Sequence, residues 1–171
     1  NIYEFGCGTA HNLIRCAQLF PKKHFYGYDW SESSQSIIQL IKNKYGYDIH
    51  GFNYDFFNHD EKIKLMGNSA VFTFGALEQT GKLYKNFIEK LIENSPGICI
   101  NIEGFNEFYD TGIESDVLAL KYHLKRNYLN GYINHLNNLE QEGRIKILNL
   151  HHVRCSNRFD DAQSFVVWRP V

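Results

Sequence analysis

The first residues able to do chemistry form a short glycine-rich stretch, in which Glu4, Gly6 and Gly8 are followed by Thr9 and Ala10. The two glycines permit a tight turn and a close approach of the backbone to a ligand. A helical pattern begins directly afterwards, so the free N–H groups of a helix N-terminus are available in the same place. A carboxylate two residues before the first glycine favours a ligand with a cationic part.

This stretch departs from the dinucleotide-binding fingerprint Gly-x-Gly-x-x-Gly. The fingerprint would require a glycine or alanine where His11 stands, and a carboxylate under the loop does not suit a pyrophosphate. The sequence is therefore a poor match for a NAD-dependent oxidoreductase, which we keep as a less favoured alternative. A lone pair of glycines can also be an ordinary turn between a strand and a helix.

Two acidic residues follow the next two β-prone segments. Asp29 comes 25 residues after the first carboxylate, at a place where an acidic side chain can accept hydrogen bonds from both hydroxyls of a ribose. Its alternative role is a helix cap, in competition with Ser31 and Ser33. Asp55 has the same position after the third strand, and there the alternative is a turn residue, with Asp60 nearby.

Candidate catalytic groups follow the later strands. Glu78 comes after the fourth strand, where it can contact a substrate, and Glu103 ends the fifth, where it can act as a general base or orient a substrate. Glu78 can equally be an acid in the first turn of a helix, and Glu103 a solvated loop carboxylate. His151 and His152 end the sixth strand, where side chains alternate between faces, so at most one of them faces the cleft.

The residues that follow these histidines offer two further readings. Arg154 and Arg158 can bind an anionic part of a substrate, or they can be surface charges. A zinc site formed with Cys155 is not expected, because adjacent histidines on a strand diverge. The four cysteines have no CxxC spacing, which favours reduced thiols in a cytoplasmic protein.

Strands and helices take turns along the chain. Predicted strands cover residues 1–5, 24–28, 49–54, 70–74, 98–102, 145–153 and 164–168. Predicted helices cover residues 10–19, 31–45, 80–94 and 115–139, the last broken near 131. Thr80 is the expected cap of the third helix, and Leu19 and Leu40 are expected on the inward sides of the first two.

This order predicts an α/β fold with a seven-stranded, doubly wound, Rossmann-like sheet. The sheet should be mostly parallel, with helices on both faces and one antiparallel C-terminal strand, since no helix separates the last two strands. Ligands of such sheets bind at the carboxyl ends of the strands. The candidate residues should therefore meet at one edge of the sheet.

The motif from Glu4 to Ala10 resembles the E/DxGxGxG motif of class I S-adenosylmethionine-dependent methyltransferases, with Ala10 in the place of the third glycine. The pair of C-terminal strands without a helix between them is also typical of that family, and the likeness covers nearly the whole chain. Residues 151–170 look similar to methyltransferase-like proteins of bacterial surface-polysaccharide pathways. The resemblance implies S-adenosylmethionine as cofactor and no metal.

The resemblance also implies a role for each matching residue. The implied cofactor contacts, from the amino-acid part to the adenine, are Glu4, Gly6, Cys7, Gly8, Asp29, Trp30, Asp55 and Phe56, with Phe74 beside the transferable methyl group. Glu78 is the implied candidate for substrate contact, and Glu103 or His152 is the expected base.

The expected activity is methyl transfer to an oxygen atom of a small molecule or a sugar; an S-adenosylmethionine-binding module without catalysis is the alternative. A net charge of −1 without a basic, aromatic-interleaved surface argues against nucleic acid as partner. No run of about 18 apolar residues predicts a membrane span. We expect one domain over residues 1–171, and a preceding segment, because the chain lacks an initial Met and opens on a strand. The acceptor and the oligomeric state are not indicated.

Overall fold

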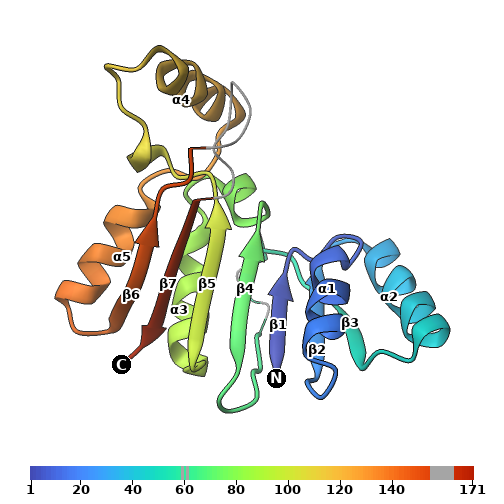
Figure 1. Ribbon diagram of the computed structural model, residues 1–171. Coiled ribbons are helices and arrows are strands. Elements are labelled where there is room, and N and C mark those ends of the chain that lie inside the picture. The colour runs from blue at the N-terminus through green and yellow to red at the C-terminus, as the bar shows by residue number, and fades with distance from the viewer. Residues whose placement is uncertain (59, 61, 155–163) are drawn as a thin grey trace.

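A computed structural model describes residues 1–58, 60, 62–154 and 164–171. Its centre is a seven-stranded sheet with the strand order β3-β2-β1-β4-β5-β7-β6 (Figure 1). The strands are β1 (Ile2–Phe5), β2 (Phe25–Asp29), β3 (Ile49–Asn53), β4 (Ala70–Phe74), β5 (Ile98–Glu103), β6 (Ile145–His151) and β7 (Ser164–Pro170). Strands β1 to β5 are parallel, and β7 is antiparallel to both of its neighbours. The expected fold class is confirmed.

Helices cover both faces of this sheet. They are α1 (His11–Leu19), α2 (Glu32–Tyr45), α3 (Tyr84–Asn94), α4 (Glu114–Arg126) and α5 (Tyr132–Gln141), with two 3-10 turns, η1 (Leu77–Thr80) and η2 (Asn106–Phe108). Leu13 of α1 and Ile38 of α2 belong to one buried cluster, whereas Phe87 of α3 and Leu136 of α5 belong to another on the opposite face. Helix α4 stands apart, above the edge at which β5 ends (Figure 1).

The strand order reverses at β1. The chain builds outward from β1 to β3, then crosses to β4 on the other side of β1 and continues to β5. All five parallel strands end at the upper edge of the sheet in Figure 1. A reversal of this kind leaves a crevice between neighbouring loops, which is where doubly wound sheets bind ligands.

Aromatic side chains cover part of the sheet where a helix is missing. The described residues between β3 and β4 form no helix, and stacked rings lie on that face instead. The Tyr3 and Tyr26 ring centroids are 4.6 Å apart, those of Phe5 and Tyr28 are 4.7 Å apart, and Phe52 stacks on Tyr28 at 5.2 Å. These cross-strand pairs hold together the strands that carry the loops of the site.

The start of α3 differs from the prediction. Thr80 does not cap this helix: its Oγ1 donates to the Leu77 carbonyl at 2.7 Å, within η1. Gly81, with φ of +62°, then redirects the chain, and α3 begins only at Tyr84. The local hydrogen bond of a threonine to its own turn competes with helix capping.

Two apolar residues expected to be inward are exposed. Leu19 and Leu40 keep 73% and 67% of their surface accessible. Each lies two positions after a buried residue, Ala17 or Ile38, and two positions are about 200° of helix rotation. Among the described residues, no helix combines the length and the apolar character needed to cross a bilayer.

Candidate functional site

The loop between β1 and α1 runs through left-handed backbone conformations. Gly6, Gly8 and Ala10 have φ angles of +77°, +49° and +59°. Glycine adopts these angles freely, whereas alanine pays about 1–2 kcal/mol. A Cβ on Gly6 would lie 2.2 Å from the Cβ of Ala76, so the first glycine lets this loop touch the loop that follows β4.

Gly8 and Asp29 join the ends of β1 and β2. The Gly8 N–H donates to Asp29 Oδ2 at 2.8 Å, and the Ser31 N–H donates to Oδ1 at 3.0 Å. An ionised carboxylate has about four acceptor positions, so each oxygen can still accept a hydroxyl. A Cβ on Gly8 would meet no atom within 4 Å. Open space therefore lies beside a carboxylate already held in place.

Glu4 lies buried beneath the same loop. The Asn12 amide, in the first turn of α1, donates to Glu4 Oε1 at 2.7 Å, whereas Oε2 has no hydrogen-bond partner among the described residues. Burial raises the pKa of Glu4 to about 8; the Asn12 hydrogen bond opposes this effect and the nearby Asp29 charge adds to it. A cationic group reaching Oε2 would favour the ionised form.

Two of the predicted cofactor residues have opposite surroundings. The Cys7 side chain is buried in the α1 and α2 cluster, where burial raises the pKa of its thiol to about 12. Only the backbone of Cys7 can therefore contact a ligand at this loop. Trp30 is 74% exposed and follows Asp29 directly. Its carbonyl accepts a hydrogen bond from Asn53 Nδ2 at 3.0 Å, which joins the ends of β2 and β3.

Asp55 and Phe56 border the site from the side of β3. Asp55 Oδ1 accepts the Phe57 N–H at 2.9 Å, so this residue forms the turn that was its alternative role. The Phe56 ring packs edge-on against Phe87 of α3, with centroids 5.0 Å apart. Its edge lies 3.7 Å from the Cβ position of Gly6.

The ends of β4 and β5 are joined through two carboxyl groups. Glu103 accepts the N–H groups of Leu77 and Glu78 at 3.3 and 3.1 Å, and Glu78 Oε2 accepts the Gly104 N–H at 3.4 Å. Glu103 is 0% exposed. Burial raises the pKa of Glu103 to about 8. The hydrogen bond with Thr73 opposes this effect, and the nearby Glu78 charge adds to it. Glu103 therefore faces backbone groups rather than a cleft.

The candidate residues at the end of β6 lie near the α4 segment. The His152 ring stacks on Phe108, with centroids 4.9 Å apart and an interplanar angle of 19°. Arg154 donates to both oxygens of Asp116, at 3.2 and 3.0 Å. Because that guanidinium is paired with the buried Asp116, the geometry does not favour the anion-binding role considered for Arg154.

Three further expectations concern the C-terminal part. Arg158 and Cys155 lie outside the described residues. The exposed His151 ring lies against Phe165, with centroids 5.4 Å apart. Within the described ranges, no group of three histidine, cysteine, aspartate or glutamate side chains is arranged to hold a metal ion.

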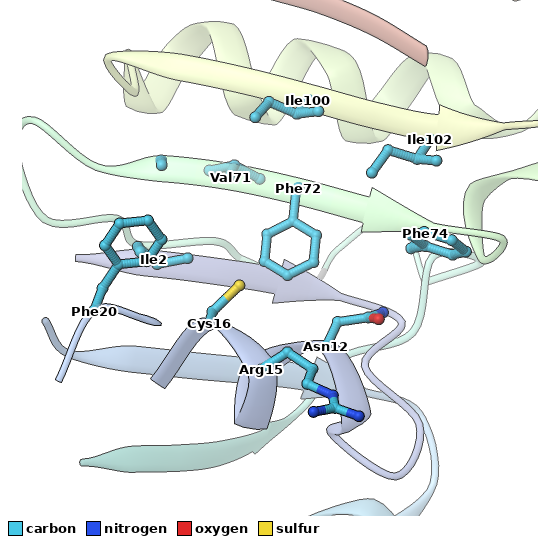
Figure 2. A pocket seen from close by; sticks show the side chains of 11 residues that line it. Ile2, Asn12, Arg15, Cys16, Phe20, Val71, Phe72, Phe74, Ile100 and Ile102 are labelled. Atoms are coloured by element: carbon cyan, nitrogen blue, oxygen red, sulfur yellow. The ribbon is translucent and has the colours of Figure 1, made fainter. Parts of the chain in front are cut away.

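An apolar groove of about 390 Å³ runs beside α1 and across β1, β4 and β5 (Figure 2). Its lining is Ile2, Asn12, Arg15, Cys16, Phe20, Ala70, Val71, Phe72, Phe74, Ile100 and Ile102. Asn12 and Phe74 lie at the end toward which the strands point. Since Asn12 also holds Glu4, the groove ends next to the glycine loop.

Comparison with known proteins gives a weak match in sequence and a clear one in structure. No protein-family model matches the chain. Malonyl-[acyl-carrier protein] O-methyltransferase of Bacillus cereus is 28% identical over 90 residues, which are 53% of this chain and 33% of that protein. The chain thus spans a third of the length of the curated relative it matches.

Solved structures share the fold over the whole chain. An O-methyltransferase of neocarzinostatin biosynthesis, in complex with S-adenosylmethionine and 2-hydroxy-5-methyl naphthoic acid, superposes with a TM-score of 0.70 at 13% identity, over 99% of this chain and 48% of that one. Magnesium protoporphyrin IX methyltransferase of Synechocystis, with bound SAH, gives 0.66 at 16% identity, over 99% and 73%. The chain has the class I methyltransferase fold.

Proposed function

We propose that this chain is the core of an S-adenosylmethionine-dependent methyltransferase that methylates an oxygen atom of a small molecule or a sugar. The observation that carries the proposal is the Gly8 N–H bond to Asp29, next to the unpartnered Oε2 of Glu4, at the point where the strand order reverses. These groups suit a ligand that has both a ribose diol and an ammonium group. Structural neighbours were solved with S-adenosylmethionine or SAH.

We assign the cofactor contacts that the resemblance implies to the same loops. The backbones of Gly6, Cys7 and Gly8 would line the cofactor, with Glu4 at its ammonium group, Asp29 at its ribose, Trp30, Asp55 and Phe56 around its adenine, and Phe74 beside the methyl group. S-adenosylmethionine supplies an electrophilic methyl group on a sulfonium sulfur. The chain supplies orientation of the acceptor and, for a hydroxyl acceptor, a group that takes the proton.

The expected bases are Glu103 and His152, but among the three catalytic candidates we favour Glu78. Glu103 is fully buried and bonded to backbone N–H groups. His152 follows β6, which is separated from β4 by β5 and β7, so the two strand ends lie about 14 Å apart at a spacing of about 4.8 Å per strand. Glu78 is also buried, with 7% of its surface exposed, and accepts the Gly104 N–H, but it belongs to the loop that touches Gly6 through Ala76. We therefore assign proton removal to Glu78.

Two alternatives from the sequence remain as competing proposals. A NAD-dependent oxidoreductase would bring a pyrophosphate next to the loop, close to the carboxyl groups of Glu4 and Asp29, and two negative groups repel each other. A binding module without catalysis would retain Glu4, Gly8 and Asp29 and lack transfer. From the cysteine spacing we also propose a cytoplasmic location.

Calorimetric titration tests the cofactor. We expect S-adenosylmethionine to bind wild-type protein with a micromolar Kd, about −8 kcal/mol, and NAD not to bind. Asp29→Ala should weaken S-adenosylmethionine at least tenfold. Asp48→Asn is the control, because Asp48 is exposed and precedes β3, at the opposite edge of the sheet. NAD binding, or no S-adenosylmethionine binding by folded protein, contradicts the proposal.

A methyl-transfer assay with labelled S-adenosylmethionine then tests catalysis. The acceptor panel would include 2-hydroxy-5-methyl naphthoic acid and malonylated acyl carrier protein, after the proteins of similar fold or sequence, together with hexoses. Label on oxygen supports the proposed reaction. Tight cofactor binding without transfer to any class of acceptor supports the binding module instead.

A further inference from the structure

Polar groups, rather than large apolar ones, make up the buried side of α4. Its buried residues are Asp116, Ala119 and His123, which share one face at helical spacing. A surface helix normally buries a stripe of large apolar side chains. The position of α4 therefore depends on what Asp116 and His123 bind.

Asp116 binds Arg154 through a two-pronged ion pair. Arg154 Nη1 lies 3.2 Å from Oδ1 and Nη2 lies 3.0 Å from Oδ2, while the Asp110 N–H donates to Oδ2 at 2.9 Å. The carboxylate side chain is 4% exposed and the guanidinium side chain 47%. Burial alone would raise the pKa of Asp116, but the Asp110 N–H and Arg154 hold it below its ordinary value. A forked pair of this kind fixes direction as well as distance.

A second contact fastens the other half of the helix. His123 Nε2 lies 3.1 Å from the Tyr109 hydroxyl, and the His123 ring packs edge-on against Tyr128. Tyr109 belongs to the segment that leaves β5, and Arg154 to the segment that leaves β6. Helix α4 is thus fastened to the exits of two strands at the carboxyl edge (Figure 1).

The place of α4 complements that of the cofactor loops. The glycine loop and Asp29 occupy the ends of β1 and β2, whereas α4 stands over the ends of β5 and β6. The His152–Phe108 stack lies between the same two exits, two residues before Arg154. These elements therefore border a part of the edge that the cofactor loops do not occupy.

We propose that Asp116 and Arg154 are a positioning pair, which holds α4 and the His152–Phe108 stack as the wall against which the methyl acceptor binds. The acceptor part of this inference rests on the proposed function. The fastening of α4 itself does not. Neither residue touches the reacting atoms; the pair acts through the wall that it holds.

Hydrogen–deuterium exchange of the full chain, with calorimetry and kinetics, tests the pair. In Arg154→Ala we expect amides of residues 114–126 to exchange at least tenfold faster, with the Kd for S-adenosylmethionine within twofold of wild type. The KM of the panel compound that wild type methylates fastest should rise at least tenfold, with kcat within threefold. Arg154→Lys should recover part of the KM, because the charge remains. Arg169→Ala is the control, since Arg169 is an exposed arginine near the end of β7.

Unchanged exchange of α4 in Arg154→Ala overturns the inference. So does an unchanged acceptor KM, or an equal loss of S-adenosylmethionine binding, which would mean a general structural defect. A wild-type protein that binds no S-adenosylmethionine, or methylates no panel compound, contradicts the proposed function instead. In that case the amide exchange of residues 114–126 still tests whether Arg154 holds α4 in place.

Discussion

The carboxyl groups of Glu78 and Glu103 each accept a backbone N–H from the other's strand end. The Glu103 carboxyl accepts the Glu78 N–H at 3.1 Å, and the Glu78 carboxyl accepts the N–H of Gly104, the residue after Glu103, at 3.4 Å. This reciprocal arrangement sets the end of β4 against the end of β5. Both carboxyl groups are buried, Glu103 at 0% exposure and Glu78 at 7%, but Glu78 lies in the loop next to the glycine turn. Substitutions of the two should therefore have separable effects.

The buried carboxyl of Glu103 should make stability depend on pH. Its pKa is raised from 4.5 to about 8, so between these values the folded protein keeps a proton that the unfolded chain has lost. Stability should therefore fall as the pH rises through this window, by about 1 kcal/mol per pH unit for each such group, and level off above it. Glu4, also raised to about 8, should contribute in the same direction.

Glu103→Gln, measured by urea unfolding between pH 5 and 9, isolates this effect. A glutamine is uncharged like the protonated carboxyl, but its Nε2 cannot accept one of the two N–H groups that Glu103 binds, so at pH 6 we expect a loss of about 1–3 kcal/mol and a weaker decline toward pH 8. Glu93→Gln, at an exposed site on α3, is the control and should leave the decline as it is. A decline toward pH 8 as steep as that of wild type would show instead that the Glu103 carboxyl does not cause the pH dependence.

Gly8 and Gly46 form a matched pair that separates backbone strain from ligand space. Both have positive φ, +49° and +69°, and a Cβ on either would meet nothing within 4 Å. Gly46 ends α2, away from the site. Each alanine variant should lose about 1–2 kcal/mol of stability, measured by thermal unfolding. Only Gly8→Ala should weaken S-adenosylmethionine binding, by at least tenfold; equal affinities in the two variants would exclude the space beside Gly8 as part of the site.

The sequence predicts the strand ends well, for a physical reason. Strands β2 and β5 alternate buried and part-exposed residues, and their ends coincide with Asp29 and Glu103. Because parallel strands end at the same edge of a sheet, residues at their carboxyl ends lie at that edge, independently of how the side chains pack. That is why the fold class and the grouping of the candidate residues could be predicted from order alone.

The partners of these residues could not be predicted in this way. Asn12 reaches Glu4 only because α1 folds back over β1, and Arg154 meets Asp116 across 38 residues. The fully buried state of Glu103 depends on a loop from another strand. The periodicity of apolar residues along the sequence does not indicate such contacts, because they form only when separate helices, strands and loops pack together.

Binding of S-adenosylmethionine should strengthen as Glu4 ionises. The pKa of free Glu4 is about 8, and an ammonium at Oε2 favours the charged form, so binding should release a proton and affinity should rise from pH 5.5 to 7. This range lies below the pKa of about 8 of an α-amino group. Calorimetry in buffers of different ionisation enthalpy measures the proton, and Glu4→Gln should abolish both effects. A pH-independent Kd in wild type would place the ammonium elsewhere.

Asn101 should be the most costly polar residue to replace beneath the site. Its side chain accepts from the Tyr132 hydroxyl at 2.7 Å and Trp168 Nε1 at 2.8 Å, and donates to Thr73 at 3.0 Å. Asn101→Leu would leave these buried groups without this partner, at about 1–3 kcal/mol each, so we expect a loss above about 3 kcal/mol. Tyr132→Phe removes one bond and should cost about 1 kcal/mol.

Chemical denaturation of both variants measures the difference. The control for Asn101→Leu is Asn149→Leu, an exposed asparagine on β6. Its free energy of unfolding should change by less than about 0.5 kcal/mol. Similar losses for Asn101→Leu and Tyr132→Phe would mean that the network contributes only one effective hydrogen bond.

Glu78→Gln should lower turnover without lowering cofactor affinity. The glutamine amide keeps an oxygen for the Gly104 N–H, so the hydrogen bond to the end of β5 persists. The amide cannot, however, take a proton from the acceptor. General base catalysis is worth about 10²–10⁴ in rate, and kcat for a hydroxyl acceptor should fall by that order while the Kd for S-adenosylmethionine stays within twofold. His152→Asn should change kcat less than tenfold, because β6 lies three strands from β4. If kcat instead falls in His152→Asn and persists in Glu78→Gln, the proton leaves from the α4 side of the cleft, and the acceptor hydroxyl must lie there too.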